Sequence, residues 1–328
     1  MDSTDAKTTT GRVSPIRQAL ILTAGLGTRL RPLTDVRAKP AIPVAGTPMV
    51  RRIASWLVAG GVDDLVLNLH HRPESLTACL GDGRDLGARV RYSWEQPRIL
   101  GSAGGPRLAR EIVGAETFFI INGDTLTDVD LSALADTHRA SGALVTLALV
   151  PNREFLRYGG VQVDAAGRVT GFVRRGPAAE GSCHYIGVQI AAARVFDGIA
   201  PGDSASSIGG IYDALIAAQP GAVRGVVSEA AFSDVGTPAD YWRTSLAWAA
   251  AENNPGAIVE PTAHVDSAAR VTRSILWDDV QVQRGAQLDE CIVTDGVVVP
   301  EGAEYRRAIL LRGDAGPIAS PLDLDSAS

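Results

Sequence analysis

Lysine is almost absent from this chain, and the position of its one internal lysine indicates a phosphate group as the partner. The chain has 31 basic residues, but only Lys7 and Lys39 are lysines. Lys39 follows the glycine-rich stretch 25–31, which comes directly after an apolar run. A lysine ammonium is a compact point charge, whereas the arginine guanidinium is a wide planar fork. We therefore expect Lys39 to contact a phosphate; the alternative is that its position is chance.

The residues before Lys39 form a loop suited to holding several phosphates. Gly25 and Gly27 let backbone N–H groups approach an anion, and Thr28 and Arg29 add donors. The loop matches neither the dinucleotide fingerprint, which has a third glycine, nor the Walker pattern that ends in Gly-Lys-Ser/Thr. The alternative is a tight turn with nothing bound. The length of the segment up to Lys39 lets one loop wrap a whole triphosphate.

Two aspartates follow predicted strands that lie far apart in the sequence. Asp124 comes just after the apolar run 118–121, and Asp234 precedes a Gly-Thr-Pro turn. Mg²⁺ in phosphate sites takes one or two carboxylates, so convergence of these two aspartates would make a site for phosphoryl or nucleotidyl transfer. The alternative for Asp124 is a helix cap or a turn. Asp128 and Asp130 are better explained as turn and N-cap residues.

Short apolar runs alternate with helical patterns over residues 16–150. This alternation predicts an α/β fold with a mainly parallel sheet and helices on both of its faces. The expected strands are 18–24, 64–69, 89–94, 117–121 and 144–150. The expected helices are 48–59, 74–80, 106–112 and 131–140. Because such sheets bind ligands outside the carboxyl ends of their strands, this fold would bring the candidate residues to one edge.

Residues after 158 have a different pattern but complete the same predicted domain, 16–254. Their expected elements are, in order, a hairpin over 161–173, a strand at 185–191, a helix near 208–218, a strand at 223–228 and a helix at 239–251. The helix at 239–251 follows Pro238, a residue favoured at helix starts.

A six-residue repeat begins after Pro255. Its apolar positions are Val259, Val265, Val271, then Leu276, Val282, Leu288, then Val293, Val299, Tyr305. This period predicts a parallel β-helix over 255–312, with a hairpin meander as the alternative. The β-helix is too short for an independent acyltransferase, so we expect a cap or an oligomerisation element. The segments 1–15 and 313–328 are expected to be disordered tails.

The composition argues against several classes of protein. The net charge is −6 and no basic block is present, so nucleic acid is not an expected partner. No apolar stretch approaches the roughly 18 residues that span a bilayer, and the first 15 residues lack the apolar segment of a secretory signal. Cys79, Cys183 and Cys291 form neither a metal-binding spacing nor a disulfide framework. We expect a cytoplasmic protein without a membrane partner.

The segments 25–40, 122–124 and 232–238 together resemble the sugar-1-phosphate nucleotidyltransferases, over residues 16–250. The six-residue repeat is similar to the left-handed β-helix that many members carry at the C-terminus. The resemblance implies the Rossmann-like nucleotide-diphospho-sugar transferase fold. It also implies a Mg²⁺-dependent reaction in which an NTP and a sugar 1-phosphate give an NDP-sugar and pyrophosphate.

The resemblance implies roles for individual residues. Arg29 and Lys39 would be catalytic, with Arg29 facing the departing pyrophosphate and Lys39 neutralising charge on the α-phosphate. Asp124 and Asp234 would hold Mg²⁺. The remaining residues would bind the nucleotide (Ala24, Gly25, Gly27, Thr28, Glu95, Gly101, Ser102 and Gly104) or the sugar phosphate (Gly123, Tyr158, Gly159, Arg175 and Tyr185).

Residues 94–105 resemble the base-reading loop of the family, and most closely that of the mannose-1-phosphate or heptose-1-phosphate guanylyltransferases. Glu95 can accept hydrogen bonds from N1–H and the amino group of guanine, which favours GTP. The alternative for Glu95 is a solvated charge at a strand end. Uridylyltransferases of the muramate and glucosamine type have a related loop, so UTP or dTTP stays open as the substrate.

The sugar side departs from the family pattern. Arg174-Arg175-Gly176 stands where Glu-Lys-Pro is usual, so Arg175 would replace a phosphate-binding lysine. Tyr185-Ile186-Gly187 stands where Asn-Ala-Gly is common. These changes predict a different sugar, such as an acidic one, or a non-catalytic regulatory subunit that binds a sugar nucleotide.

The intact Lys39, Asp124 and Asp234 favour an enzyme over that regulatory subunit, because a sensor has less use for a metal and a reaction-facing lysine. We therefore predict a sugar-1-phosphate nucleotidyltransferase whose partners are an NTP and a sugar 1-phosphate. A homo-oligomer formed through the β-helix is a further expectation.

Overall fold

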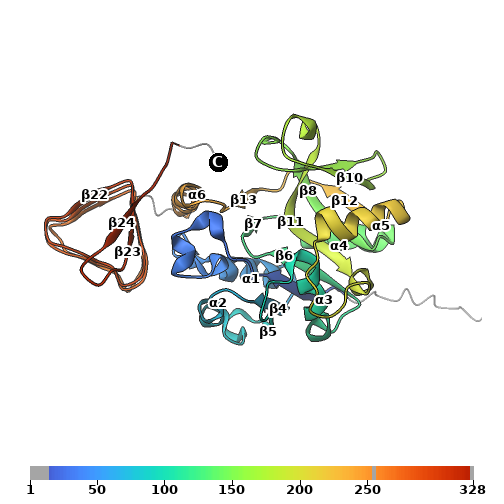
Figure 1. The fold of residues 1–328 in the computed structure, drawn as a ribbon, viewed down its shortest axis with the longest axis horizontal. Helices are drawn as coiled ribbons and strands as arrows, with labels where there is room; N and C mark the ends of the chain where they lie inside the picture. Colours follow the sequence, from blue (N-terminus) through green and yellow to red (C-terminus); the bar gives the residue numbers. More distant parts are fainter. Residues whose placement is uncertain (1–14, 253–255, 326–328) are drawn as a thin grey trace, which may run out of the picture.

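The computed structural model describes residues 15–252 and 256–325, which form an α/β domain followed by a parallel β-helix (Figure 1). The predicted N-terminal tail, 1–15, lies outside the described residues except for its last residue. Within the described ranges, no helix is both long and apolar enough to cross a membrane.

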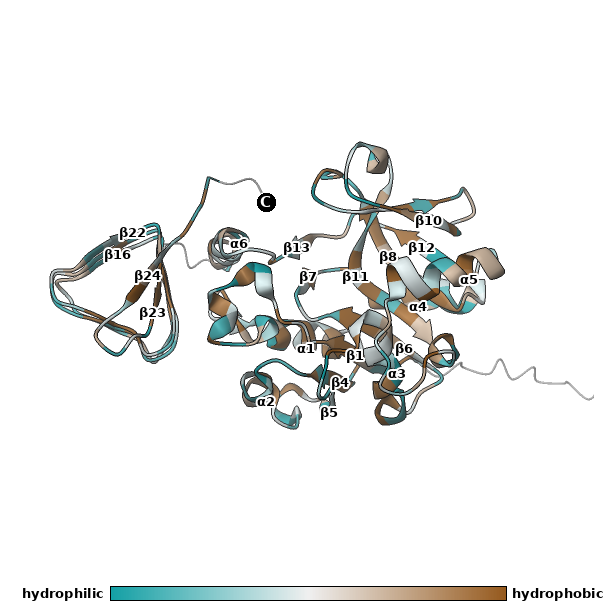
Figure 2. Cartoon of the chain, viewed as in Figure 1, coloured by the Kyte–Doolittle hydropathy of each residue, from teal (hydrophilic) through white to brown (hydrophobic). Residues whose placement is uncertain are grey.

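The α/β domain is built on a nine-stranded sheet with a parallel centre. Its parallel strands, in spatial order, are β6 (Thr117–Asn122), β1 (Gln18–Leu22), β4 (Asp64–Leu69) and β5 (Arg89–Trp94). Figure 2 shows that strands of this sheet are mostly hydrophobic, as expected for strands covered on both faces.

The other half of the sheet is mixed. β11 (Cys183–Ala192) runs antiparallel to both β6 and β8 (Val145–Pro151), which makes it the junction between the two halves. The remaining strands are β12 (Val223–Val227), parallel to β8, and the antiparallel pair β9 (Gly160–Val163) and β10 (Val169–Val173). The predicted hairpin over 161–173 is therefore present.

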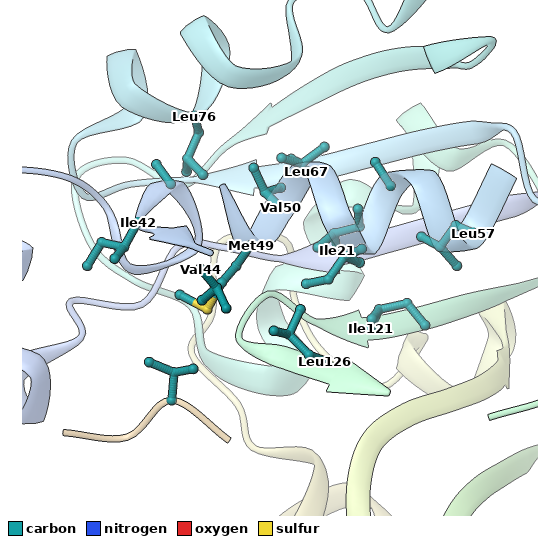
Figure 3. Close-up of a cluster of buried hydrophobic side chains, with 14 of the residues drawn as sticks. Ile21, Ile42, Val44, Met49, Val50, Leu57, Leu67, Leu76, Ile121 and Leu126 are labelled. Atoms are coloured by element: carbon teal, nitrogen blue, oxygen red, sulfur yellow. The ribbon is translucent and has the colours of Figure 1, made fainter. Parts of the chain in front are cut away.

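Helices cover both faces of the sheet, as the alternating pattern predicts. The helices are α1 (Met49–Ala59), α2 (Pro73–Leu80), α3 (Gly101–Val113), α4 (Leu131–Ser141), α5 (Tyr212–Ala218) and α6 (Pro238–Ala251). Ile21 of β1 joins the buried cluster that contains residues of α1, α2 and α4, whereas Leu20 joins the cluster on the α3 and α5 side. Figure 3 shows the first cluster, with Val50 and Leu57 of α1 against Ile21.

Local signals in the sequence explain where the helices begin and end. The carboxylate of Asp130 accepts hydrogen bonds from the backbone N–H of Ser132 and Ala133, which confirms it as the N-cap of α4. Thr237 starts α6 with a capping box, directly before the predicted proline. α3 begins at Gly101, five residues before its predicted start at 106, because the glycine-rich stretch continues into the helix.

The C-terminal region is a parallel β-helix, as the six-residue repeat predicts. One face is formed by β14 (Ile258–Val259), β17 (Ile275–Leu276), β20 (Ile292–Val293) and β23 (Ala308–Leu311). The other faces are β15 (His264–Val265), β18 (Gln281–Val282), β21 (Val298–Val299) and β16 (Arg270–Thr272), β19 (Gln287–Asp289), β22 (Glu304–Arg306). The β-helix lies at one end of the molecule, beside α6 (Figure 1).

The predicted disordered tail at 313–328 is wrong for part of its length. Residues Ile318–Pro321 form β24, which pairs antiparallel with β23, and Leu322 is buried. The tail covers the edge that β23 would otherwise leave unpaired, and such edges are commonly protected in native sheets. Residues 326–328 lie outside the described ranges.

Candidate active site

A short antiparallel ladder brings the two candidate metal ligands together. β7 (Thr125–Thr127) pairs with β13 (Phe232–Asp234) so that Asp234 lies opposite Thr125, next to Asp124. The Nζ atom of Lys39 donates to Oδ2 of Asp124 at 2.5 Å and lies 3.9 Å from Oδ1 of Asp234. Three predicted residues from three distant parts of the chain thus meet at one point.

Gly25 and Gly27 have different structural roles in the glycine-rich loop. Gly27 has a positive φ of 61°, and a Cβ atom there would lie 2.8 Å from Cγ2 of Thr34 and 3.1 Å from Cβ of Lys39. Gly27 therefore gives the segment its shape. A Cβ atom at Gly25 would meet nothing within 4 Å, so Gly25 leaves open space beside the backbone.

A cavity of about 420 Å³ collects most of the predicted nucleotide-side residues. The predicted residues that line it are Ala24, Gly25, Gly27, Thr28, Arg29, Lys39, Glu95, Gly101, Ser102, Gly123 and Asp124. Residues that the sequence argument did not assign also line it: Leu22, Thr23, Pro40, Asn68, Ile99, Asn122 and Gly236. Arg29 is exposed, and its Nη1 atom would lie 3.5 Å from a Cβ atom at Gly236, close to Asp234.

Glu95 also lines this cavity and is fully buried, so a solvated charge is the wrong description of it. One carboxylate oxygen accepts from Nδ2 of Asn68 at 2.6 Å, and the other accepts from the backbone N–H of Leu100 at 2.7 Å. Oδ1 of Asn68 in turn accepts from the backbone N–H of Thr23 at 2.6 Å. The role of Asn68 was missed, although a buried amide near the carboxyl end of an apolar strand is a usable signal.

Gly101, Ser102 and Gly104 belong to the first turn of α3 instead of a loop. Gly101 and Ser102 line the cavity, but Gly104 does not. A Cβ atom at Gly104 would lie 2.3 Å from the carbonyl oxygen of Asp203, so this glycine allows close packing of α3 against the 203–205 segment.

The carboxylate pair carries more negative charge than Lys39 alone compensates. Burial raises the pKa of Asp234, and the neighbouring Asp124 raises it further, while Lys39 and Arg29 act in the opposite direction. Carboxylate oxygens are the donors that Mg²⁺ prefers. In the described part of the chain no three His, Cys, Asp or Glu side chains form a metal-binding group. A two-carboxylate site fits Mg²⁺, which takes its other ligands from phosphates and water.

Of the predicted sugar-side residues, Gly123 lines the cavity, whereas Tyr158, Gly159, Arg175 and Tyr185 lie outside it. The Tyr158 ring stacks on His184 at 4.2 Å between centroids and meets the edge of Phe232 at 5.7 Å. Burial raises the pKa of Tyr158 to about 12. Phe232 belongs to β13, the strand that ends at Asp234, so the aromatic cluster and the carboxylate pair share one element.

Tyr185 lies on β11, at an irregularity in its pairing with β8. Its hydroxyl oxygen is buried and has no hydrogen-bond partner among the described residues. Burial raises the pKa of Tyr185, with smaller contributions from Tyr212 and Asp124. Gly187, with φ of 80°, shapes this irregularity. Arg175 is exposed, and the backbone of its loop passes close to Gly159.

Comparison with known proteins agrees with this geometry. The sequence model of the nucleotidyl transferase family matches residues 18–250, and that of the GlmU-like C-terminal hexapeptide matches 253–305. A mannose-1-phosphate guanylyltransferase of Mycobacterium tuberculosis is 29% identical over 297 residues, covering 83% of this chain and 82% of the relative. A D-glycero-alpha-D-manno-heptose 1-phosphate guanylyltransferase of Aneurinibacillus thermoaerophilus is 34% identical over 224 residues, covering 68% and 95%.

Solved structures show the same fold. HddC from Yersinia pseudotuberculosis superposes with a TM-score of 0.62 at 24% identity, covering 71% of this chain and 100% of that one. The same protein complexed with GMP-PN gives a TM-score of 0.60 at 23% identity. The family match spans most of the chain, and the matched region contains the cavity lined by Lys39 and Asp124. The chain therefore belongs to the nucleotidyl transferase family, among the sugar-1-phosphate nucleotidyltransferases.

Proposed function

We propose that this enzyme transfers the guanylyl group of GTP to a mannose- or heptose-1-phosphate-like sugar, giving a GDP-sugar and pyrophosphate. The observation that carries the proposal is the meeting of Lys39, Asp124 and Asp234 beside the open loop at Gly25. A cation and two carboxylates at a cavity of about 420 Å³ suit a reaction at a phosphorus atom of a bound nucleotide.

In the proposed reaction, an oxygen of the sugar phosphate attacks the α-phosphorus of GTP. The new P–O bond forms as the bond between the α-phosphorus and the oxygen that bridges to the β-phosphate breaks, and pyrophosphate leaves. The nucleophile is already an anion, so the enzyme needs no strong base. Catalysis then depends on orientation and on stabilising charge. Lys39 would act on the α-phosphate, and exposed Arg29 on the departing pyrophosphate.

Asp124 and Asp234 would hold the Mg²⁺ ion. When bound, the ion would supply positive charge that offsets the negative charge of the phosphates. Lys39 already lies between the two carboxylates, at 2.5 Å and 3.9 Å from their nearest oxygens. Its ammonium would have to share these carboxylates with the metal, or turn toward the nucleotide when both are bound.

Glu95 supports guanine as the base. Each of its carboxylate oxygens accepts one hydrogen bond and keeps a second lone pair for the N1–H or amino group of guanine. The two bonds also fix the orientation of the carboxylate before the nucleotide binds. UTP or dTTP is the second candidate, supported by a UTP–glucose-1-phosphate uridylyltransferase of Synechocystis that is 28% identical over 81% of this chain.

A substrate panel tests the proposal. The protein is incubated with each NTP, Mg²⁺ and mannose, heptose, glucose and uronic acid 1-phosphates, and pyrophosphate and product mass are measured. The guanylyltransferase relatives favour GTP and a neutral mannose- or heptose-type sugar, for which we expect the highest kcat/KM. The uronic acid 1-phosphate tests the alternative of an acidic sugar, which the departures at Arg175 and Tyr185 favour. A preference for UTP or dTTP would contradict GTP as the nucleotide substrate. A preference for the acidic sugar phosphate would contradict a mannose- or heptose-type sugar as the second substrate.

Absence of turnover with every pair would overturn the catalytic proposal and favour a regulatory subunit that binds a sugar nucleotide. Assembly through the β-helix is a separate part of the proposal. Light scattering after size exclusion tests it, with a mass above that of the 34.3 kDa chain as the expected result.

A further inference from the structure

The segment that carries Lys39 is attached to the β-helix by one arginine. Nε and Nη2 of Arg37 donate to the two carboxylate oxygens of Asp295 at 2.7 and 2.5 Å, and Nη2 also donates to Oδ2 of Asp278 at 2.6 Å. The guanidinium lies over the ring of Trp277, with Cζ 5.2 Å from the ring centroid. The Arg37 side chain is only 16% exposed.

The two aspartates occupy the same position on adjacent coils of the β-helix. Ile275 and Ile292 pair in register, and Asp278 and Asp295 follow them at the same distance along the chain. The coil stacking therefore sets the two carboxylates side by side, facing one guanidinium. A planar fork can bond both, whereas the single ammonium of a lysine cannot reproduce this geometry.

Apolar contacts hold the β-helix against the α/β domain around this polar contact. Ile258, Ile275 and Trp277 belong to the same buried cluster as Leu30 and Leu33 of the glycine-rich segment. Nε1 of Trp277 donates to the hydroxyl of Tyr241 in α6 at 2.8 Å. The β-helix is thus part of the wall against which the Lys39 segment packs.

Arg37 is separated from Lys39 by Ala38 alone. Consecutive Cα atoms are about 3.8 Å apart, so the Cα atoms of Arg37 and Lys39 are within about 8 Å of each other. The segment also contacts the region of α2: the backbone N–H of Ala38 donates to Oγ of Ser75 at 3.0 Å, and Nε2 of His71 contacts the carbonyl oxygen of Thr34 at 2.9 Å. Contacts with the β-helix and with the α2 region therefore both hold the segment next to Lys39.

We propose that Arg37 is a positioning residue, through which Asp278 and Asp295 of the β-helix hold Lys39 in its reactive position. A displacement of about 1 Å in a catalytic group lowers the rate by up to about 100-fold, so loss of this contact reduces turnover without removing any group that touches substrate. The activity part of the test rests on the proposed function.

The design of the variants must separate this role from a loss of folding. Arg37→Gln leaves Asp278 and Asp295 unpaired, near the buried Glu260, whose pKa burial and Asp278 raise to about 7. The double variant Asp278→Asn/Asp295→Asn removes the carboxylates instead. The triple variant adds Arg37→Gln to these two changes. It therefore leaves neither a guanidinium nor a carboxylate without its ion-pair partner, and each new side chain is an amide that occupies part of the same space.

Arg52 supplies a matched control. It is buried to a similar degree, with 13% of its side chain exposed, pairs with Glu252 at 2.7 Å and lies over Trp248 at 4.7 Å. It resembles Arg37 in chemistry but belongs to α1. Its hydrogen bonds go to Glu252 and to the carbonyl oxygens of Val44 and Ala45, so within the described residues it forms no hydrogen bond or ion pair with residues 25–40. Arg52→Gln therefore reports what the loss of such a contact does to stability alone.

The experiment measures kcat, KM for each substrate, melting temperature and backbone hydrogen exchange at Ala41 and Ile42, whose N–H groups bond to Ala38 and Lys39. We expect kcat to fall about 10- to 100-fold in Arg37→Gln and in the double variant, with KM for the nucleotide changed less than about threefold. The triple variant should have a kcat no lower than that of Arg37→Gln or of the double variant, because all three variants remove the same contact between Arg37 and the two aspartates.

Exchange at Ala41 and Ile42 should accelerate in these variants, whereas Arg52→Gln should keep wild-type kcat and exchange.

Unchanged kcat and exchange in the triple variant would overturn the inference, as would an equal fall of kcat in Arg52→Gln. If the wild-type protein shows no turnover, the proposed function fails, and the exchange comparison between the triple variant and Arg52→Gln still decides whether Arg37 holds the segment.

Discussion

The proposed nucleotide side and the proposed sugar side of the site differ in the residues that form them. On the nucleotide side, a cavity of about 420 Å³ is lined by glycines, Lys39 and Asp124, and Gly25 has open space beside it. On the sugar side, the rings of Tyr158, His184 and Phe232 pack on one another. Polar groups with free space suit a charged ligand, whereas packed rings offer flat surfaces and few donors.

This difference indicates how the two halves of the proposed reaction are divided. In the proposed reaction the charges that act on phosphates belong to the nucleotide side, so changes there should lower kcat. The sugar side should set which sugar binds, so changes there should alter KM for the sugar phosphate. The following predictions test this division, starting with the largest effect.

Replacing Lys39 by arginine should have the largest effect. The Lys39 Cβ atom lies in a crowded turn beside Gly27, and its Nζ atom lies within reach of both aspartates, so a longer planar group would be misplaced. We expect kcat/KM to fall about 100- to 1,000-fold, the cost of losing one preorganised donor at the transition state, because the guanidinium keeps the charge but not its position. Lys7→Arg, at the only other lysine, is the control and should keep full activity. A fully active Lys39→Arg variant would remove the basis for assigning Lys39 to the α-phosphate.

Asp234→Asn should lower kcat about 10- to 100-fold and raise the Mg²⁺ concentration needed for half-maximal rate, because one hard-oxygen ligand is lost. A Mg²⁺ titration of turnover measures both effects. Asp128→Asn is a suitable control, since Asp128 lies beyond the far end of β7 and its carboxylate bonds to the backbone N–H of Ala231. An unchanged Mg²⁺ requirement in Asp234→Asn would show that this carboxylate does not hold the metal.

The rate should also depend on pH through Asp234. Burial and Asp124 raise the pKa of Asp234, so the metal-binding carboxylate form is lost as the pH falls through this raised value. Mg²⁺ binds the carboxylate form, so the acid limb of kcat/KM for the nucleotide should move to lower pH as the Mg²⁺ concentration rises. An acid limb that stays fixed across Mg²⁺ concentrations would contradict this assignment.

Tyr185→Phe should have the smallest effect and should act on the sugar side. The buried hydroxyl makes no hydrogen bond within the described residues, so its removal should leave the free energy of unfolding unchanged or raise it by up to about 1 kcal/mol. If this hydroxyl binds the sugar phosphate, KM for that substrate should rise roughly fivefold, the loss of about one hydrogen bond, while KM for the nucleotide stays the same.

Tyr212→Phe is the matched comparison for Tyr185→Phe. The Tyr212 hydroxyl is also buried, but it donates to Oε1 of Gln189 at 2.9 Å. Its removal should cost about 1 kcal/mol of stability and leave KM for the sugar phosphate unchanged. Equal behaviour of the two variants would mean that Tyr185 has no part in the sugar site.

The nucleotide side was the more predictable half because its signals are local. A lysine after a glycine-rich turn and an aspartate at the end of a buried strand can be recognised from a few neighbouring residues. The repeat of the β-helix is also a local signal, since its apolar residues recur every six positions within each coil. Lys39, Asp124 and Asp234 could each be recognised from neighbouring residues, and the fold then brings the three together.

The features that the sequence did not predict depend on distant partners. The burial of Glu95 follows from its bonds to Asn68 and Leu100, and the packing of Gly104 depends on the carbonyl of Asp203. β24 forms because the edge of β23 is available to it. The contact of Arg37 with Asp278 and Asp295 likewise requires the register of two coils, which no single stretch of sequence contains.

The most direct test of the account follows the two ends of the nucleotide separately. GTP labelled with ³²P at the α-phosphate or at the γ-phosphate is incubated with the enzyme, Mg²⁺ and the sugar 1-phosphate that the panel selects. We expect the α label in the GDP-sugar and the γ label in pyrophosphate, and we expect both transfers to be lost together in Lys39→Arg. Appearance of the γ label on the sugar, or as free phosphate without GDP-sugar, would contradict it.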